Sequence, residues 1–172
     1  FVSKGPSAGN RVVSMSADGS MQMSVGYRFD LNKDGTLYTS QDYWTTWTQH
    51  VTSINSWLNG TVSLDGNVLI ASGFGTPVYM SIDRGVTWKI NPQIAEREHI
   101  IDFDLSQDGS VILELRLNKP LYISTDKGVT FQEKEIVRDY QSVSMSLTGE
   151  IQTVVVNGGG VYVSNDFGST WN

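Results

Sequence analysis

Two short segments of this sequence bring together side chains that could do chemistry. Residues 96–99 read Glu-Arg-Glu-His and residues 138–140 read Arg-Asp-Tyr, so each combines acidic and basic groups. Hydrolysis of a glycosidic bond needs two carboxyl groups at a defined separation. Asp102 and Asp104 lie on one side of an expected strand, although nothing in the sequence identifies them as a catalytic pair. We therefore favour solvated loops with ordinary ion pairs, and we assign no catalytic residue.

A ligand at these loops would be held by charged and aromatic side chains. Exposed aromatic rings can stack on sugars, and Tyr43, Trp44 and Trp57 are the rings that we expect on loops. For Trp44, packing against a neighbouring repeat is an equal alternative. We expect His50 and His99 to be surface residues rather than metal ligands. The candidate ligand-binding residues are Arg28, Trp57, Glu96, Arg97, Glu98, His99, Arg116, Arg138, Asp139 and Tyr140.

One loop has the ligand spacing of a calcium site. Asp30, Asn32 and Asp34 alternate and are followed by Gly35, as in the first half of an EF-hand loop. The position of the bidentate Glu holds Gln41, and no helices are expected on either side, so an EF-hand is excluded. A polar hairpin loop is the preferred interpretation. Calcium is a possible ligand, and no cofactor is expected.

A sequence motif that occurs four times indicates the strands and turns that position these residues. Each copy has an aliphatic residue and a Tyr, then Ser-x-Asp, and then a Thr and an aromatic residue. Successive Asp residues are 41, 43 and 40 positions apart, a period typical of stacked or radial repeat proteins. The repeated residues are Asp42, Asp83, Asp126 and Asp166, with Trp47, Trp88, Phe131 and Trp171 as the aromatic residues.

A second turn signal shares this period. A Ser-x-Asp/Thr-Gly sequence precedes a short apolar run in each repeat, and Asp-Gly between such runs predicts a β-hairpin. The Tyr and its β-branched neighbours predict another strand, which ends in a tight turn that the Asp can hold by accepting backbone N–H bonds. Each repeat is therefore expected to contain four antiparallel strands, the blade of a β-propeller. The predicted fold class is all-β.

The glycine of the repeated phrase is expected to adopt a positive φ, which costs other residues roughly 1 kcal/mol. Gly85, Gly128 and Gly168 hold this position in three copies, and Trp44 holds it in the first. Trp44 should either change the geometry of the first turn or be accommodated there at some cost.

The octapeptide Ser-x-Asp-x-Gly-x-Thr-Trp resembles the Asp-box, also called the BNR repeat. It is complete at residues 81–88 and 164–171, has Phe131 as its aromatic residue in the third copy, and has Trp44 for Gly in the first. The resemblance covers essentially the whole chain. It implies a β-propeller like those of sialidases, some xyloglucan-cleaving glycosidases, sortilin-type receptors and photosystem assembly factors. Because enzymes and pure binders share the motif, it does not decide activity.

The resemblance also implies a division of the surface. In such propellers the octapeptide turns lie on one face, and the active sites of the related enzymes lie on the other, among the loops between the second and third strands and between blades. A sialidase clamps a carboxylate with three Arg and uses a Tyr nucleophile with an acid partner. Arg28, Arg97, Arg116 and Arg138 could form such a clamp in principle. However, the Phe/Tyr-Arg-Ile-Pro motif is missing, and residues 27–30 match only its first two positions.

Composition argues against several kinds of partner and chemistry. The net charge is −6 and the isoelectric point is about 4.7, which argues against nucleic acid or an anionic membrane. The sequence has no run of about 18 apolar residues, the length needed to span a bilayer. The absence of Cys excludes disulfides, thiol catalysis and Cys-ligated zinc. Abundant Ser, Thr, Gly and Asn favour an extracellular or surface location without specifying the compartment.

We interpret residues 1–172 as one β-propeller region with blades near residues 11–50, 58–91, 100–134 and 141–172. Residues 1–10 would be the last strand of a preceding blade or the strand that closes a ring. Asp-box propellers usually have six or more blades, so part of a larger propeller is favoured over a four-bladed ring. The favoured function is a non-enzymatic binding or structural module that presents loops to a protein or glycan. The alternative is a segment of a glycoside hydrolase, sialidase-like or xyloglucanase-like, whose site is completed outside this sequence.

Overall fold

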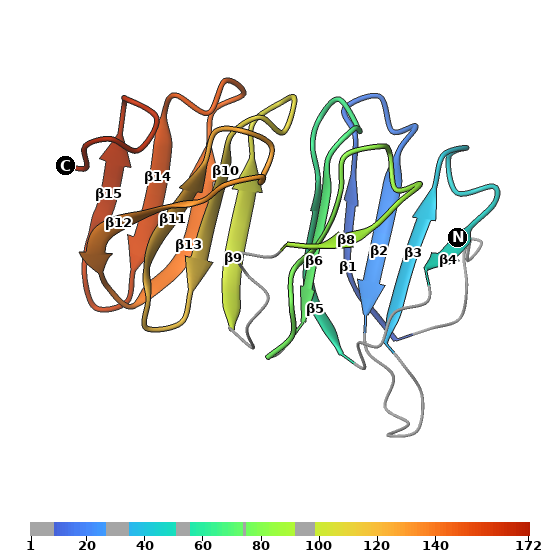
Figure 1. The fold of residues 1–172 in the computed structure, drawn as a ribbon, viewed down its shortest axis with the longest axis horizontal. Helices are drawn as coiled ribbons and strands as arrows, with labels where there is room; N and C mark the ends of the chain where they lie inside the picture. The colour runs from blue at the N-terminus through green and yellow to red at the C-terminus, as the bar shows by residue number, and fades with distance from the viewer. Residues whose placement is uncertain (1–8, 27–34, 51–55, 74, 92–98) are drawn as a thin grey trace.

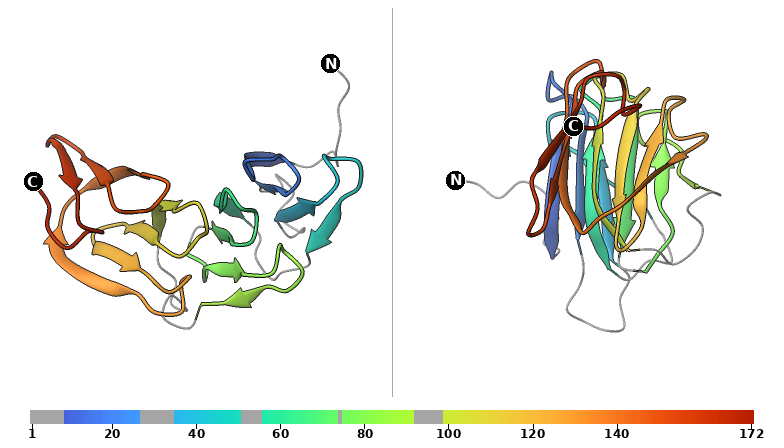
Figure 2. Two further views of the ribbon diagram at one scale, coloured as in Figure 1. Left: turned by 90° about the horizontal axis from the view of Figure 1, so that it is seen from above. Right: turned by 90° about the vertical axis from the view of Figure 1, so that its left-hand side faces the viewer.

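The computed structural model describes residues 9–26, 35–50, 56–73, 75–91 and 99–172. These residues form four antiparallel β-sheets, which stand side by side in chain order along an arc (Figures 1 and 2). Three sheets have four strands each and the fourth has three. Strands that follow one another in the sequence are hydrogen-bonded neighbours within each sheet. The all-β prediction is confirmed, and each sheet is a blade of a β-propeller.

Every blade is a series of consecutive hairpins. Blade 1 consists of β1 (Asn10–Met15), β2 (Gln22–Gly26), β3 (Thr36–Ser40) and β4 (Thr48–His50). Blade 2 consists of β5 (Trp57–Val62), β6 (Leu69–Gly73), β7 (Tyr79–Ser81) and β8 (Lys89–Ile90). Blade 3 consists of β9 (Ile100–Leu105), β10 (Ile112–Arg116), β11 (Pro120–Ser124) and β12 (Gln132–Val137). Blade 4 consists of β13 (Tyr140–Met145), β14 (Gln152–Val156) and β15 (Val161–Ser164).

The structure describes the pairing of the last residues of the chain but not that of the first eight. The strand expected at residues 1–10 falls mainly on residues 1–8, which lie outside the described residues, while Asn10 begins β1. At the other end, the backbone N–H groups of Val163 and Asn172 each donate to the other residue's carbonyl at 3.0 Å. Asn172 therefore occupies the place where the fourth strand of blade 3 pairs with β11.

The first turn of each blade is closed by a serine hydroxyl. In blade 1, Ser16 Oγ donates to Asp18 Oδ1 at 2.6 Å and accepts from the backbone N–H of Met21 at 3.0 Å. Ser63, Ser106 and Ser146 accept the equivalent backbone N–H bond in the other blades, at 3.0, 2.9 and 3.1 Å. The turns therefore satisfy their own backbone donors without help from a core.

The octapeptide turns repeat a second local network. In blade 2, Asp83 Oδ1 accepts from the Thr87 backbone N–H at 2.9 Å and from Ser81 Oγ at 2.7 Å, while Asp83 Oδ2 accepts from Thr87 Oγ1. The backbone N–H of Gly85 donates to Ser81 Oγ at 2.9 Å. The indole N–H of Trp88 donates to the Gly85 carbonyl at 3.2 Å, which fixes the ring over the turn. The same bonds to Asp recur at Asp126 and Asp166.

Trp44 is accommodated in the first turn without a change in its geometry. Its φ is 63°, positive like the 76° and 77° values of the equivalent glycines, and its N–H donates to Ser40 Oγ at 3.0 Å. A Cβ added at Gly168 would lie 2.0 Å from Ile123 Cδ1 of the preceding blade. Blade 1 has no preceding blade in the described part of the chain, so Trp44 has room to lie over Trp47, with ring centroids 3.4 Å apart.

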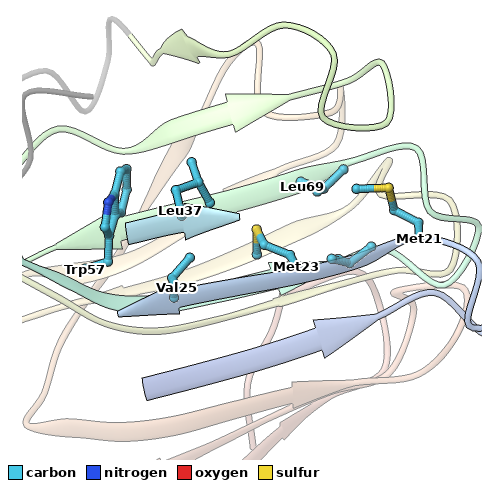
Figure 3. Close-up of a cluster of buried hydrophobic side chains, with 8 residues drawn as sticks. Met21, Met23, Val25, Leu37, Trp57 and Leu69 are labelled. Carbon is cyan, nitrogen blue, oxygen red and sulfur yellow. The ribbon is translucent and has the colours of Figure 1, made fainter. Parts of the chain in front are cut away.

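The core lies between successive blades. Met21, Met23, Val25 and Leu37 of blade 1 pack against Trp57, Val62, Leu69 and Ala71 of blade 2 (Figure 3). Equivalent clusters join blade 2 to blade 3 and blade 3 to blade 4. The second strands β2, β6 and β10 are buried throughout, and neighbouring blades cover both faces of β6 and β10. No helix in the described residues is long and apolar enough to cross a membrane.

The turns gather at one end of the sheets. The backbone N–H groups of Arg84, Lys127 and Phe167 in the octapeptides donate to the first turn of the same blade at 3.1–3.2 Å. We call this the turn end. The connections between second and third strands and between blades form the opposite end, the loop end. Its described connections include residues 117–119, 138–139 and 157–160.

Candidate functional site

Several sequence candidates for the loop end fall on residues that the structure does not describe. These are Arg28, Glu96, Arg97 and Glu98 of the predicted ligand site, and Asp30, Asn32 and Asp34 of the predicted calcium loop. The described candidates are Trp57, His99, Arg116, Arg138, Asp139 and Tyr140. Among the described residues, no group of three or more His, Cys, Asp or Glu side chains could hold a metal ion.

Arg116 belongs to a buried charged cluster in blade 3. Its Nε donates to Glu114 Oε1 at 2.7 Å, and both side chains are almost completely buried. The guanidinium lies over the ring of Tyr122, 3.7 Å from the centroid. Glu114 precedes Arg116 by two residues on β10, so the strand places both on the same face. Burial of an ion pair is tolerated when geometry and added contacts compensate for the lost hydration, as the cation–π contact does here.

Arg138 makes a similar contact in blade 4. Its Nη1 donates to Tyr162 Oη at 2.8 Å, and its guanidinium carbon is 4.2 Å from the centroid of that ring. Next to it, Asp139 Oδ2 accepts from the Asn157 side-chain amide at 2.8 Å and Asp139 Oδ1 accepts from Gln141 Nε2 at 3.1 Å. The structure thus brings Arg138 and Asp139 together with Tyr162 and Asn157, two residues that the sequence did not single out as ligands.

Asp102 and Asp104 join blade 3 to blade 4. Asp102 Oδ2 accepts from Ser142 Oγ at 2.9 Å and from the Val143 backbone N–H at 3.1 Å. Asp104 Oδ2 accepts from the Met145 backbone N–H at 2.7 Å. Burial raises the pKa of Asp104 above its usual value, although the hydrogen bonds from the Leu105 and Met145 N–H groups oppose the shift. The two carboxylates are therefore acceptors for a neighbouring strand.

Two aromatic candidates lie in the core. Trp57 was expected on a loop, but it begins β5 and is fully buried, with its ring edge-on to Tyr79 at 5.5 Å. The expectation of an exposed ring is corrected, because the preceding blade covers this position. Tyr140 begins β13 and is also buried, and burial raises its pKa above the usual tyrosine value. His99 is half-buried, and its carbonyl accepts the Leu117 N–H at 2.9 Å.

The remaining aromatic candidates lie at the turn end of blade 1. Tyr43 is exposed, and Trp44 is half-buried against Trp47. His50 was expected at the surface, but it is half-buried, with its Nε2 2.8 Å from Thr39 Oγ1 and its ring 5.5 Å from that of Trp88. Burial lowers the pKa of His50. This contact links blades 1 and 2.

A groove of about 280 Å³ opens between blades 2 and 3, on the side of the octapeptides. Apolar side chains of Met80, Ile82, Ile90 and Val129 line it together with Lys89 and Lys127. No sequence motif marked the groove, because Ile82, Lys127 and Val129 are variable positions of two octapeptides and Lys89 and Ile90 belong to the strand that follows one of them.

Comparison with known proteins places the fold. No protein-family model and no curated protein matches the sequence. A GH74 enzyme of Niastella koreensis has a TM-score of 0.67 and 22% identity, over 95% of this chain and 24% of that chain. The GH74 xyloglucanase of Xanthomonas campestris has a TM-score of 0.71 and 14% identity, over 95% of this chain and 30% of that chain. The computationally designed Ika4 protein has a TM-score of 0.69 and 9% identity, over 93% of this chain and 92% of that chain.

These identities show the fold alone. This chain spans less than a third of the length of the two GH74 enzymes that it matches. The comparisons therefore agree with a propeller built from blades of this type.

Proposed function

We propose that this chain is a non-enzymatic β-propeller module of the Asp-box type, which presents its loop end to a glycan or protein partner. The observation that carries the proposal is the engagement of the described carboxylates of blades 3 and 4 outside the turns as structural acceptors. Asp102 and Asp104 bind donors of blade 4, Glu114 binds Arg116, and Asp139 binds Asn157. A general acid or base must reach the proton that it transfers, and these groups are already held by protein donors.

The Asp-box assignment rests on the shared geometry of four turns. In each, Asp accepts from the backbone N–H and the hydroxyl of the Thr four residues later. The indole N–H bonds at Trp88 and Trp171 repeat at 3.2 Å. Because these side chains act within their own turn, the motif supports the fold and leaves binding to other residues.

A glycan is the partner that the neighbouring structures favour. The structurally similar protein from Xanthomonas campestris is a xyloglucanase, so xyloglucan is the first probe to use. The loop end offers Arg138 and Asp139, whose donors and acceptors suit sugar hydroxyls, beside Asn157. Arg28 and Arg97 are sequence candidates for the same end.

Affinity electrophoresis in a gel that contains xyloglucan tests this proposal. We expect retardation of the chain, and less retardation after Arg97→Ala or Arg138→Ala. Val129→Ala is the matched control, because Val129 is exposed at the turn end. Equal retardation of all three variants would contradict binding at the loop end, and no retardation would exclude xyloglucan as the partner.

A glycoside hydrolase segment is the second candidate function. The likeness to two GH74 enzymes favours it, and the catalytic site would then need carboxylates other than those bound to protein donors in the described residues. Glu96→Gln and Glu98→Gln are suitable probes of catalysis. Substitution of Asp102 or Asp104 is unsuitable, because it removes bonds between blades 3 and 4 and would reduce activity through the fold.

A further inference from the structure

The groove between blades 2 and 3 has the size and lining of a small-molecule site. The buried side chains of Met80 and Asn91 line it, together with Ile82, Ile90 and Val129, which are 61%, 45% and 66% exposed. Its volume of about 280 Å³ is near the lower end of the range of ligand pockets, about 300 Å³. Exposed apolar side chains around a hollow of this size indicate a place where a ligand can bury them.

A difference between two blade junctions explains why the groove opens between blades 2 and 3. Between blades 1 and 2, Gln41 Nε2 donates to the Arg84 carbonyl at 3.0 Å and so bridges the junction. Between blades 2 and 3, Ile82 takes the place of Gln41, and Lys127 takes the place of Arg84. Because an isoleucine side chain cannot donate a hydrogen bond, it cannot form this bridge, and the junction is left open and apolar at the surface.

A buried hydrogen bond holds together the two blades that form the groove. In blades 2 and 4, the indole N–H of Trp88 and of Trp171 donates to the glycine carbonyl of the same turn. Phe131 of blade 3 has no such N–H, and the Gly128 carbonyl instead accepts from Asn91 Nδ2 of blade 2 at 2.7 Å. Both Gly128 and Asn91 are buried. The groove is therefore preformed, which reduces the ordering that a ligand must impose on the protein.

Two lysines make the groove cationic in a chain whose net charge is −6. Lys89 and Lys127 both line it, and both side chains are exposed. At the preceding junction the cation is engaged, since Arg84 donates to Ser20 Oγ at 3.2 Å and to the Asp65 carbonyl at 3.4 Å. Within the described residues neither lysine forms an ion pair, although the charge of Lys127 also acts on the Asp65 carboxylate. The two ammonium groups are therefore available to an anionic ligand.

We propose that this groove binds an aliphatic carboxylate, a small molecule with a hydrocarbon chain and one carboxylate group. The hydrocarbon chain lies against Met80, Ile82 and Val129, and removal of its methylene groups from water drives binding. The carboxylate interacts with the ammonium groups of Lys89 and Lys127. Lysine suits this position, because its methylene stem extends along apolar surface while its charged end stays in water.

The lining of the groove favours this ligand over a sugar or a protein segment. Among the described residues no aromatic ring lines the groove, whereas sugars bind well to exposed rings. Nine described residues line it, whereas a typical protein interface has about 20 to 30 residues on each side. The groove also lies on the side of the octapeptides, so its ligand is distinct from a glycan at the loop end.

A methyl NMR titration of the 172-residue chain with octanoate tests the proposal. We expect saturable shifts of the methyl groups of Ile82, Ile90 and Val129. Octan-1-ol has the same hydrocarbon chain without the charge, and it should bind about tenfold more weakly. Ile82→Gln introduces the residue that bridges the preceding junction, so it should abolish saturable binding. Leu147→Gln, an equally exposed site in blade 4, is the matched control and should bind octanoate like the original chain.

Removal of the two charges separates their contribution from that of the apolar lining. The double variant Lys89→Gln and Lys127→Gln should bind octanoate about tenfold more weakly and octan-1-ol as before. Lys134→Gln is the matched control, because Lys134 occupies the position of Asn91 at the next junction. All these side chains except Lys134 are exposed, and an unchanged Tm confirms folding. The proposal is overturned by the absence of saturable shifts, by equal affinity for octanoate and octan-1-ol, or by unchanged binding in Ile82→Gln. Tighter binding of a capped Glu-Leu-Glu peptide than of octanoate would also overturn it and assign the groove to an acidic protein segment.

Discussion

The turn end and the loop end of this protein use similar residues in opposite ways. At the turn end, each Asp and Ser binds the backbone of its own turn, and the same bonds recur from blade to blade. Along the strands, Asp102 and Asp104 bind a different blade, and towards the loop end the pairs of Arg116 and Arg138 with tyrosine have no described equivalents in blades 1 and 2. Repetition therefore marks contacts within a turn, and the departures from it mark contacts that are particular to blades 3 and 4.

The largest effect is expected at Glu114, where the loop end depends on a pair that does not repeat. Glu114→Ala should reduce the free energy of unfolding by about 3 kcal/mol or more, because Arg116 would remain buried without its carboxylate. Denaturant unfolding measures the change. Replacing Glu114 and Arg116 together by Leu and Met should cost much less, and an equal loss in both variants would show that the ion pair is not the cause.

A smaller effect should separate two glycines of the turn end. Gly109 and Gly19 both have positive φ, but a Cβ at Gly109 would lie 2.5 Å from Val68 Cβ whereas the nearest atom to one at Gly19 is 3.9 Å away. Gly109→Ala should lower the free energy of unfolding by about 3 kcal/mol, through backbone strain and a displaced blade. Gly19→Ala should lower it by about 1 kcal/mol. Equal losses would contradict the role of Gly109 in blade packing.

The Asp residues of the turn end should make stability fall in acid. Hydrogen bonds from the Thr87 hydroxyl and backbone lower the pKa of Asp83 to about 2 from a usual value near 3.8, and Thr170 does the same for Asp166. Because the folded-state pKa is the lower one, the stabilisation is present above pH 3.8 and is lost as the pH falls through 2. Asp83→Asn should lower the Tm at pH 7 by about 3 °C, as for a lost capping side chain.

The same variant gives the control for this pH dependence. The difference in Tm between Asp83→Asn and the original chain should shrink as the pH approaches 2, since protonation removes the charge that the substitution removes. Thermal scans between about pH 2 and pH 7 measure it. A constant difference across this range would show that the carboxylate charge does not hold the turn.

The smallest effect is expected at Trp44, where a substitution should stabilise the protein and not destabilise it. Trp44→Gly should raise the free energy of unfolding by about 1 kcal/mol, because glycine adopts a φ of 63° without strain. The stacking with Trp47 offsets part of this gain. Thermal unfolding measures the change. Destabilisation would mean that the contact between the two rings outweighs the strain.

The sequence predicted the strands and turns because the interactions that form them are local. Asp83 and Thr87 lie in one octapeptide, so their spacing alone indicates the hydrogen bonds between them. The contacts between blades were less predictable. Asp104 meets Met145 from a blade 41 residues later, and Trp57 is buried because the preceding blade covers it. The partners of Arg116 could have been found, since Glu114 and Arg116 occupy the same face of one strand.

Release of reducing ends from xyloglucan by the purified 172-residue chain tests the central claim most directly. The carboxylates Asp102, Asp104 and Glu114 hold strands and side chains together, so we expect no release above a heat-inactivated control. Release that Glu96→Gln or Glu98→Gln abolishes, with the Tm of the chain unchanged, would contradict the account and establish a hydrolase.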